Sequence, residues 1–270
     1  MIQIDRRHFI AGLGGTAAVA KMSHEARAEA LEEYMIERLN PPQSGQFPTS
    51  AEVEAQITTR HYRRGAGNLF LMTAEGSNVA MLDPMPERPT IQDFFEHRFG
   101  RTRNHCFQSA NRAMETGQSE EVILACLLHD TVQELIKVDH GYWGAQMYGP
   151  YVPERTSMAI RYHQALRFYA DEEHGYAYPD LYHRMFGEDY VPAPYIQDAK
   201  AYIESHDWYM DARMVTVSDL YAFQEGVVMS IEPYLDLLGR HFKQPAEGLG
   251  YDNSTVAHMW RSIAMPDNPL

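Results

Sequence analysis

From about residue 93 onward, the order of hydrophobic and polar residues becomes that of amphipathic helices. Ser119, followed by two glutamates, predicts the start of a helix that runs through an apolar stretch to Leu128. Pro153 predicts the start of a second helix, whose apolar positions turn His163 inward. A long helix is expected over residues 207–228, and the last one over residues 231–242. Strand signals are weak in this part, so the sequence predicts an all-α core.

The preceding segment has a different pattern. Residues 40–92 are rich in Pro, Gly and Thr, and prolines interrupt any regular element. Short helices and a hairpin around residues 69–82 are the most that this stretch indicates. We therefore expect residues 31–92 to form an irregular lead-in, and residues 93–270 to form one helical domain.

The first 30 residues resemble a twin-arginine export signal. Arg6 and Arg7 precede Phe9, Ile10 and a weakly apolar run rich in Gly and Ala. This run is too short for a permanent membrane span, and the small-x-small triplets at residues 18–20 and 26–28 are candidate cleavage positions. The alternative is an ordinary amphipathic helix. The resemblance implies contact with the export machinery and a periplasmic or secreted location.

Composition narrows the classes of function. The chain has 270 residues, of which 44% are hydrophobic and 11% aromatic, enough for one large domain with a core. A net charge of −14 argues against nucleic acid or an anionic membrane as partner. A small-molecule substrate remains, and it can be anionic if the site is locally basic. We expect Cys106 and Cys126 to be small core residues, although a disulfide is possible.

The chemistry is indicated by an ordered set of histidines and aspartates. Imidazole together with carboxylate suits iron, manganese or zinc, and adjacent His129 and Asp130 let Asp130 bridge two ions while His129 binds one. Taken singly, each histidine is more typical of a buried, hydrogen-bonded core residue. As a set they predict a di-metal site in the helical core. The six predicted ligands are His105, His129, Asp130, His140, His163 and Asp219.

Asp219 is the least certain of these ligands by spacing, because Asp211 lies nearby on the expected helix. Three other histidines, His174, His183 and His206, are expected at the surface or behind the ligands. Four aromatic residues are expected to line a pocket, or, for at least two of them, to pack in the core: Tyr142, Trp143, Tyr162 and Tyr169.

The blocks around the ligands resemble the HD-domain superfamily, whose name is the His129-Asp130 pair. His105-Cys-Phe-Gln108-Ser-Ala110 and the later Leu127-Leu128-His129-Asp130 are most similar to its PhnZ-like branch, associated with phosphonate degradation. The blocks that begin at His140 and Ile160 also fit. The likeness covers about residues 93–243, and its last block, around Asp219, is loose.

The resemblance implies an HD-type helical bundle and a mixed-valent di-iron centre, Fe(II)/Fe(III), with dioxygen as co-substrate. One iron would take His105, His129, Asp130 and Asp219. The other would take His140 and His163, share Asp130 and keep open positions. Asp130 and His163 are then the expected catalytic residues, and the reaction oxidises a C–H bond of a small polar substrate that bears a phosphonate or carboxylate.

The sequence departs from the branch around the substrate. Gln133 stands where a histidine is usual, Arg167 replaces a lysine, and the run after Asp219 differs. Phenylalanines at 94, 95 and 99 precede His105 in place of an expected tyrosine. We expect Arg167, Gln133 and Gln108 to bind substrate, because arginine can grip an anion in bidentate fashion. The alternatives are a solvated helix arginine, a helix-end cap for Gln133, and ligand orientation by Gln108.

Two other functions remain open at this point. The same six ligands suit an HD-type phosphohydrolase, in which two metals activate water against a phosphate ester. The altered residues around the substrate also allow a secreted metal-binding protein without activity. The Gln108 block favours the oxygenase.

Overall fold

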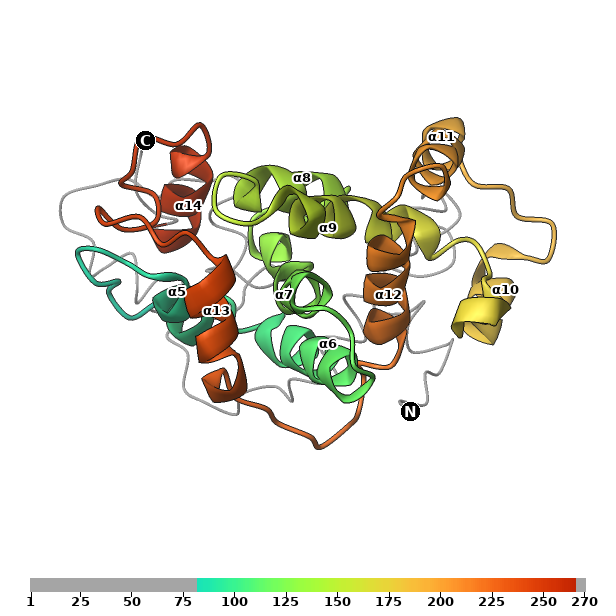
Figure 1. Cartoon of the computed structure of the whole chain (residues 1–270), viewed down its shortest axis with the longest axis horizontal. Helices are drawn as coiled ribbons and strands as arrows, with labels where there is room; N and C mark the ends of the chain where they lie inside the picture. Colours follow the sequence, from blue (N-terminus) through green and yellow to red (C-terminus); the bar gives the residue numbers. More distant parts are fainter. Residues whose placement is uncertain (1–81, 266–270) are drawn as a thin grey trace, which may run out of the picture.

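The computed structural model describes residues 82–265 of the chain, and in this range the protein is helical. An isolated bridge between Asp171 and Tyr176 is the one β-type pairing there. The predicted all-α fold is therefore confirmed (Figure 1). The α-helices are α5 (Ile91–His97), α6 (Arg103–Glu115), α7 (Glu120–Leu128), α8 (His140–Tyr148), α9 (Glu154–Leu166), α10 (Asp180–Phe186), α11 (Pro194–Glu204), α12 (Tyr209–Leu220), α13 (Leu235–His241) and α14 (Ala257–Ala264). Short 3-10 helices are η2 (Thr131–Glu134), η3 (Glu172–His174) and η4 (Glu232–Tyr234).

Local capping explains where several helices begin. Thr90 and Asp93 form a capping box at the start of α5, each accepting the other's backbone N–H. The Ser119 hydroxyl accepts from the backbone N–H of Val122 at the start of α7. Pro153 is the residue before α9. The predicted starts of these last two helices are confirmed.

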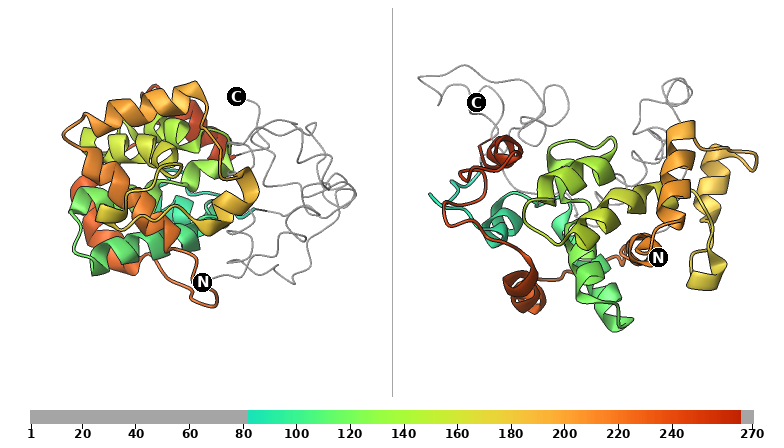
Figure 2. Two further views of the ribbon diagram at one scale, coloured as in Figure 1. Left: turned by 90° about the vertical axis from the view of Figure 1, so that its right-hand side faces the viewer. Right: turned by 45° about the horizontal axis from the view of Figure 1, so that its top comes forward.

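Helix α7 is the centre of the bundle. Its side chains from Val122 to Leu128 are buried except Ile123, which is half-buried, so α7 is apolar on all sides. It packs against α6, α9, α12 and α13, while α8 lies along α9. Helices α5, α13 and α14 lie at one end of the molecule and α10 and α11 at the other (Figure 1, Figure 2).

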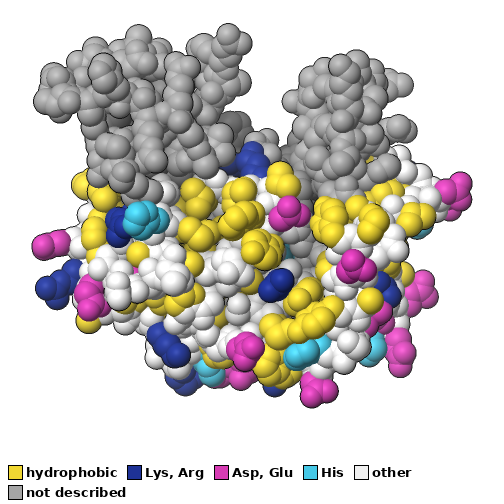
Figure 3. All heavy atoms as spheres, turned by 90° about the horizontal axis from the view of Figure 1, so that it is seen from above, with side chains coloured by type: hydrophobic (Ala, Val, Ile, Leu, Met, Phe, Trp, Pro, Cys, Tyr) yellow, Lys and Arg dark blue, Asp and Glu magenta, His cyan; other side chains and the backbone are white. Residues whose placement is uncertain are grey.

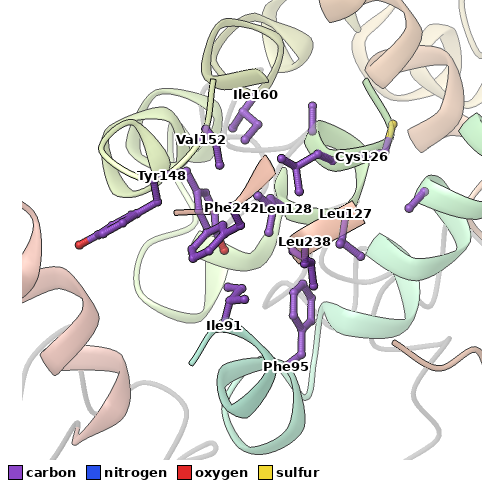
Figure 4. Close-up of a cluster of buried hydrophobic side chains, with 14 of the residues drawn as sticks. Ile91, Phe95, Cys126, Leu127, Leu128, Tyr148, Val152, Ile160, Leu238 and Phe242 are labelled. Carbon is purple, nitrogen blue, oxygen red and sulfur yellow. The ribbon is translucent and has the colours of Figure 1, made fainter. Parts of the chain in front are cut away.

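The larger hydrophobic core lies between α7 and the end of the molecule that holds α5, α13 and α14. Figure 4 shows Leu127 and Leu128 of α7 among side chains from α5, α8, α9 and α13. A group of aromatic rings closes this core, with Trp260 of α14 in edge contact with Phe94 and Tyr148. This packing fixes the end of α7, and with it His129 and Asp130.

A buried arginine joins α12 to the end of α9. Arg213 of α12 is 1% exposed and donates to the carbonyl oxygens of Leu166, the last residue of α9, and of Tyr169, three residues later. It also pairs with Asp171 at 3.3 Å and donates to the Tyr209 hydroxyl. These bonds compensate the buried guanidinium charge, which would otherwise be costly. Since they reach from α12 to the end of α9, they also hold the two helices together.

Two expectations about helix length are wrong. The helix expected over residues 207–228 is α12, which ends at Leu220, and a loop of residues 221–231 follows it. The helix expected over residues 231–242 is divided into η4 and α13. It is also not the last, because α14 follows and buries Trp260 and Ile263.

The export signal and the hairpin predicted around residues 69–82 lie outside the described residues, apart from residue 82, so both stay predictions. No helix within residues 82–265 is long and apolar enough to cross a membrane. Both cysteines are buried and free, as expected of core residues. On the face seen from above, hydrophobic side chains gather among scattered charged ones (Figure 3). The exposed aromatic side chains of the described residues include Tyr142 and Trp143 on α8 and Tyr202 on α11.

Candidate metal centre

Four buried histidines meet in the bundle as two facing pairs. The Nε2 atoms of His105 and His129 lie 3.2 Å apart, and so do those of His140 and His163. All four side chains are at most 1% exposed. They come from α6, the end of α7, α8 and α9, so four separate elements converge on one point.

The other ring nitrogen of each histidine is bound to a backbone carbonyl. His129, His140 and His163 donate from Nδ1 to the carbonyls of the residues three positions earlier, at 2.8, 3.3 and 2.6 Å. His105 donates to the carbonyl of Ala222, at 3.2 Å. These bonds place a hydrogen on each Nδ1, so that every ring in its neutral form has its lone pair on Nε2. Lone pairs 3.2 Å apart repel unless a cation or a proton lies between them.

Asp130 lies between the two pairs. Its Oδ1 is 3.2 Å from His140 Nε2 and 3.5 Å from His129 Nε2, and its Oδ2 is 3.4 Å from His105 Nε2. His163 Nε2 is 3.7 Å from Oδ1. The carboxylate is fully buried, yet neither of its oxygens has a hydrogen-bond partner among the described residues. A buried carboxylate without hydrogen bonds is costly, and a bound cation would stabilise it.

Asp219 completes one side of this group. Its Oδ1 lies 3.0 Å from His105 Nε2 and 3.8 Å from His129 Nε2, and this oxygen also lacks a hydrogen-bond partner in the described part. Asp211, the competing candidate, forms a bidentate ion pair with Arg155 instead. The structure thus brings all six predicted ligands together and favours Asp219 over Asp211.

The charges in the cluster are strongly coupled. Burial alone lowers the pKa of His105, but Asp130 and Asp219 outweigh it and raise that pKa to about 10. Burial lowers the pKa of His163 to about 4, with the neighbouring His129 and His140 adding to the effect and Asp130 opposing it. Burial opposes ionisation of both aspartates, yet the surrounding imidazoles hold their pKa values below the usual range. The cluster therefore keeps its carboxylates negative, as a cation site requires.

Neighbouring helices hold the ligands in place. The Thr131 hydroxyl donates to the Leu128 carbonyl and contacts the Tyr148 hydroxyl at 2.5 Å, which fixes the chain just after Asp130. The Thr216 hydroxyl of α12 donates to the His163 carbonyl of α9 at 2.8 Å. These bonds come from residues in the packed core, so the ligands sit on rigid supports.

The three predicted substrate-binding residues are all buried. Arg167 is 3% exposed at the end of α9, one helical turn after His163, so the alternative of a solvated helix arginine is wrong. The Tyr176 hydroxyl donates to the Arg167 carbonyl at 2.7 Å, and burial raises the pKa of this tyrosine well above its usual value. Gln133 is 4% exposed and belongs to η2, the 3-10 helix that begins immediately after Asp130 in the sequence. Their contact with substrate stays a prediction.

Gln108 has a different environment from the one expected. Its side-chain amide binds the backbone of Gln224 and Val227, in the loop that follows α12. These contacts favour the alternative that it orients a ligand over direct contact with substrate. The residues that sequence reasoning missed belong to the same loop: Ala222 supplies the carbonyl for His105, and Phe223 stacks on its ring at 4.5 Å. Their position directly after the loosely matched Asp219 block was the available signal.

The remaining candidates lie away from the cluster. His174 is exposed and binds Asp171, and His183 and His206 are half-buried among tyrosines and Trp208. Of the four aromatic candidates, Tyr142 and Trp143 are exposed on α8. The other two pack on neighbouring side chains, Tyr162 on Tyr202 and Tyr169 under Lys200.

The donor set fits a metal centre. His105, His129 and Asp130 form one group of ligand atoms within 4.8 Å of one another, and Asp130, His140 and His163 form a second. Each group can hold a metal ion, with nitrogen and oxygen donors and no thiolate.

Comparison with known protein families finds no match for this chain, and comparison with curated proteins finds none either.

Proposed function

We propose that this protein is an oxygenase that binds two iron ions and oxidises a C–H bond of a small anionic substrate. The observation that carries the proposal is the pair of ligand groups that share Asp130. A carboxylate common to two groups is suited to bridging two ions, and imidazole with carboxylate suits iron. The sequence likeness of the ligand blocks to the PhnZ-like branch of HD-domain proteins supports the choice of chemistry.

The two halves of the cluster differ in a way that suits catalysis. Asp219 adds a fourth ligand to the half with His105 and His129, since its Oδ1 lies within 3.8 Å of both Nε2 atoms. The half with His140 and His163 has three protein ligands, Asp130 included. A catalytic ion needs open positions, so we assign substrate binding to this second half. The iron pair would supply activation of dioxygen, while the protein positions the substrate.

The chain's own residues would select the substrate. Arg167 follows His163 by one helical turn, and its guanidinium is buried, where charge-assisted hydrogen bonds to a phosphonate or carboxylate are strong. Gln133 follows the shared carboxylate by three residues and offers both a donor and an acceptor. We propose that these two residues hold the anionic group of the substrate and its polar neighbour.

One experiment tests the reaction class. The protein is prepared anaerobically with iron, and its EPR spectrum is recorded before and after small phosphonates and carboxylates are added. We expect a coupled Fe(II)/Fe(III) signal that substrate perturbs, together with substrate-dependent oxygen uptake. Phosphate-ester hydrolysis with manganese, without any oxygen uptake, would instead establish the phosphohydrolase. Two bound ions with neither activity would leave a metal-binding protein and refute the proposed enzyme.

A further inference from the structure

Two polar side chains of α6 form hydrogen bonds with the backbone of the loop of residues 222–229. Asn104 donates to the Val227 carbonyl at 2.9 Å and accepts from the Met229 N–H at 3.0 Å. Gln108 donates to the carbonyls of Gln224 and Val227 at 3.1 and 3.0 Å, and accepts from the Gln224 N–H at 2.8 Å. Both side chains are at most 6% exposed. They supply the backbone bonds that a helix would otherwise provide.

Apolar packing holds the two ends of this loop, where Ala222 and Phe223 are buried and Met229 packs against the core, whereas residues 224–228 are exposed. Helix α12 has already ended at Leu220, and Gly226 has a φ of +78°, which ends any helical path. Val227 and Val228 are 40% and 84% exposed, so they contribute little apolar burial. Hydrogen bonds from α6 are therefore a main source of order for residues 224–228.

The same loop holds one metal ligand. The Ala222 carbonyl accepts the Nδ1–H of His105 at 3.2 Å, and the Phe223 ring stacks on the imidazole at 4.5 Å with an interplanar angle of 29°. His129, His140 and His163 each use a carbonyl three residues earlier in their own segment. Among these four ring-to-carbonyl hydrogen bonds of the described residues, only that of His105 reaches a distant part of the sequence, 117 residues away.

We propose that Asn104 and Gln108 are positioning residues of the metal centre, which act through the 222–229 loop on His105. The inference rests on the proposed two-ion site and adds an asymmetry to it. Without the hydrogen bonds from Asn104 and Gln108, the loop could move. The Ala222 carbonyl would then no longer fix the orientation of the His105 ring. The half with His105 and His129 would then bind its ion more weakly, while the half with His140 and His163 would keep its own.

The test is a calorimetric titration of the metal-free full chain with Co(II) under anaerobic conditions, with the d–d absorption recorded in parallel. The variants His105→Ala and His140→Ala assign each binding step to one half. We expect Gln108→Leu and Asn104→Leu each to weaken the His105 step by roughly 10- to 100-fold, the usual effect of removing a residue behind a metal ligand. The His140 step should not change.

The matched control is Asn111→Leu on the same helix, because the Asn111 amide binds only Glu115 at the helix surface among the bonds described. This variant should keep both steps. Equal weakening of both steps in the Gln108 and Asn104 variants, no change in either step, or loss of the helical circular dichroism in both variants would overturn the inference. A wild-type chain without two Co(II) steps would instead refute the two-ion site itself.

Discussion

Asp130 is the one residue that belongs to both ligand groups. We therefore expect Asp130→Asn to remove both ions, whereas His140→Ala removes only the one in its own half. An amide oxygen is a much weaker ligand than a carboxylate, and it cannot balance the charge of two cations. Metal content after anaerobic iron loading, measured by mass spectrometry, checks this. Asp211→Asn is the control, because Asp211 pairs with Arg155 away from the cluster; two ions retained in the Asp130 variant would contradict the bridge.

Glu134 gives the fold a pH dependence that is independent of the ligands. Its Oε1 accepts from the Arg101 N–H at 3.0 Å, and burial raises its pKa from 4.5 to about 7, although the neighbouring Arg101 opposes the shift. Because the unfolded chain releases this proton first, stability falls as pH rises from about 4.5 through 7 and stays low above that.

Glu134→Gln should remove that loss, since the amide keeps the acceptor for Arg101 and does not ionise. Near pH 8 we expect the variant to be more stable than wild type by about 3 kcal/mol, and near pH 4 the two should be similar. Urea unfolding across this range, in the presence of chelator, measures the difference. Parallel stability profiles for the two proteins would show that the Glu134 carboxyl titrates normally.

Among the helices, the contact of α8 with α9 determines how His140 meets His163. A Cβ at Gly141 would lie 2.9 Å from the Arg161 carbonyl oxygen and 3.1 Å from that of Ile160, both backbone atoms that cannot easily move. The Ile160 carbonyl also accepts from His163 Nδ1. The absence of a side chain at residue 141 is thus what lets the two histidines approach.

Gly141→Ala should therefore force α8 away from α9. We expect a loss of roughly 1–3 kcal/mol in stability, typical of an overpacked contact, and weaker binding of the ion in the His140 half. Gly239→Ala in α13 is the matched control, because nothing lies within 4 Å of its Cβ position and alanine favours a helix. Urea unfolding and Co(II) titration of both variants check the prediction. Equal stability of the two alanine variants would contradict it.

The sequence predicted the helices whose signals are local. Ser119 and Pro153 mark the starts of α7 and α9, and the apolar run before His129 predicts its buried end. The end of α12 was not predictable in this way, because the following loop is held by Asn104 and Gln108, more than 100 residues earlier. Helix α14 was missed, although its buried residues Ala257, Trp260 and Ile263 recur at helical spacing.

The same distinction holds for the site. The types and order of these residues were enough to name six candidate ligands whose side chains converge in the core, because imidazole and carboxylate groups together suit metal ions. They could not show that Gln108 faces a loop, or that Arg167 is buried, since both depend on how distant segments pack. Candidate ligands can therefore be named from the sequence, whereas the residues that hold them in position are known only from the tertiary structure.

At the scale of the molecule, the six ligands connect five helices or helix ends, from α6 to α12, across more than 110 residues of sequence. No short segment contains a complete group of ligands. An ion that binds both halves therefore binds the folded chain and has little affinity for the unfolded one. Metal binding and folding should be thermodynamically linked.

This linkage gives a prediction for the whole protein. At a free Mn(II) concentration 100 times the dissociation constant, each ion should stabilise the fold by about 2.7 kcal/mol, because binding is confined to the folded state. For a domain of this size, that corresponds to a rise in Tm of roughly 5–10 °C per ion. Calorimetric scans with Mn(II) and with chelator measure it. A double variant, His105→Ala with His163→Ala, removes a ligand from each half and should show no such rise, whereas equal shifts in wild type and variant would place the bound metal outside the cluster.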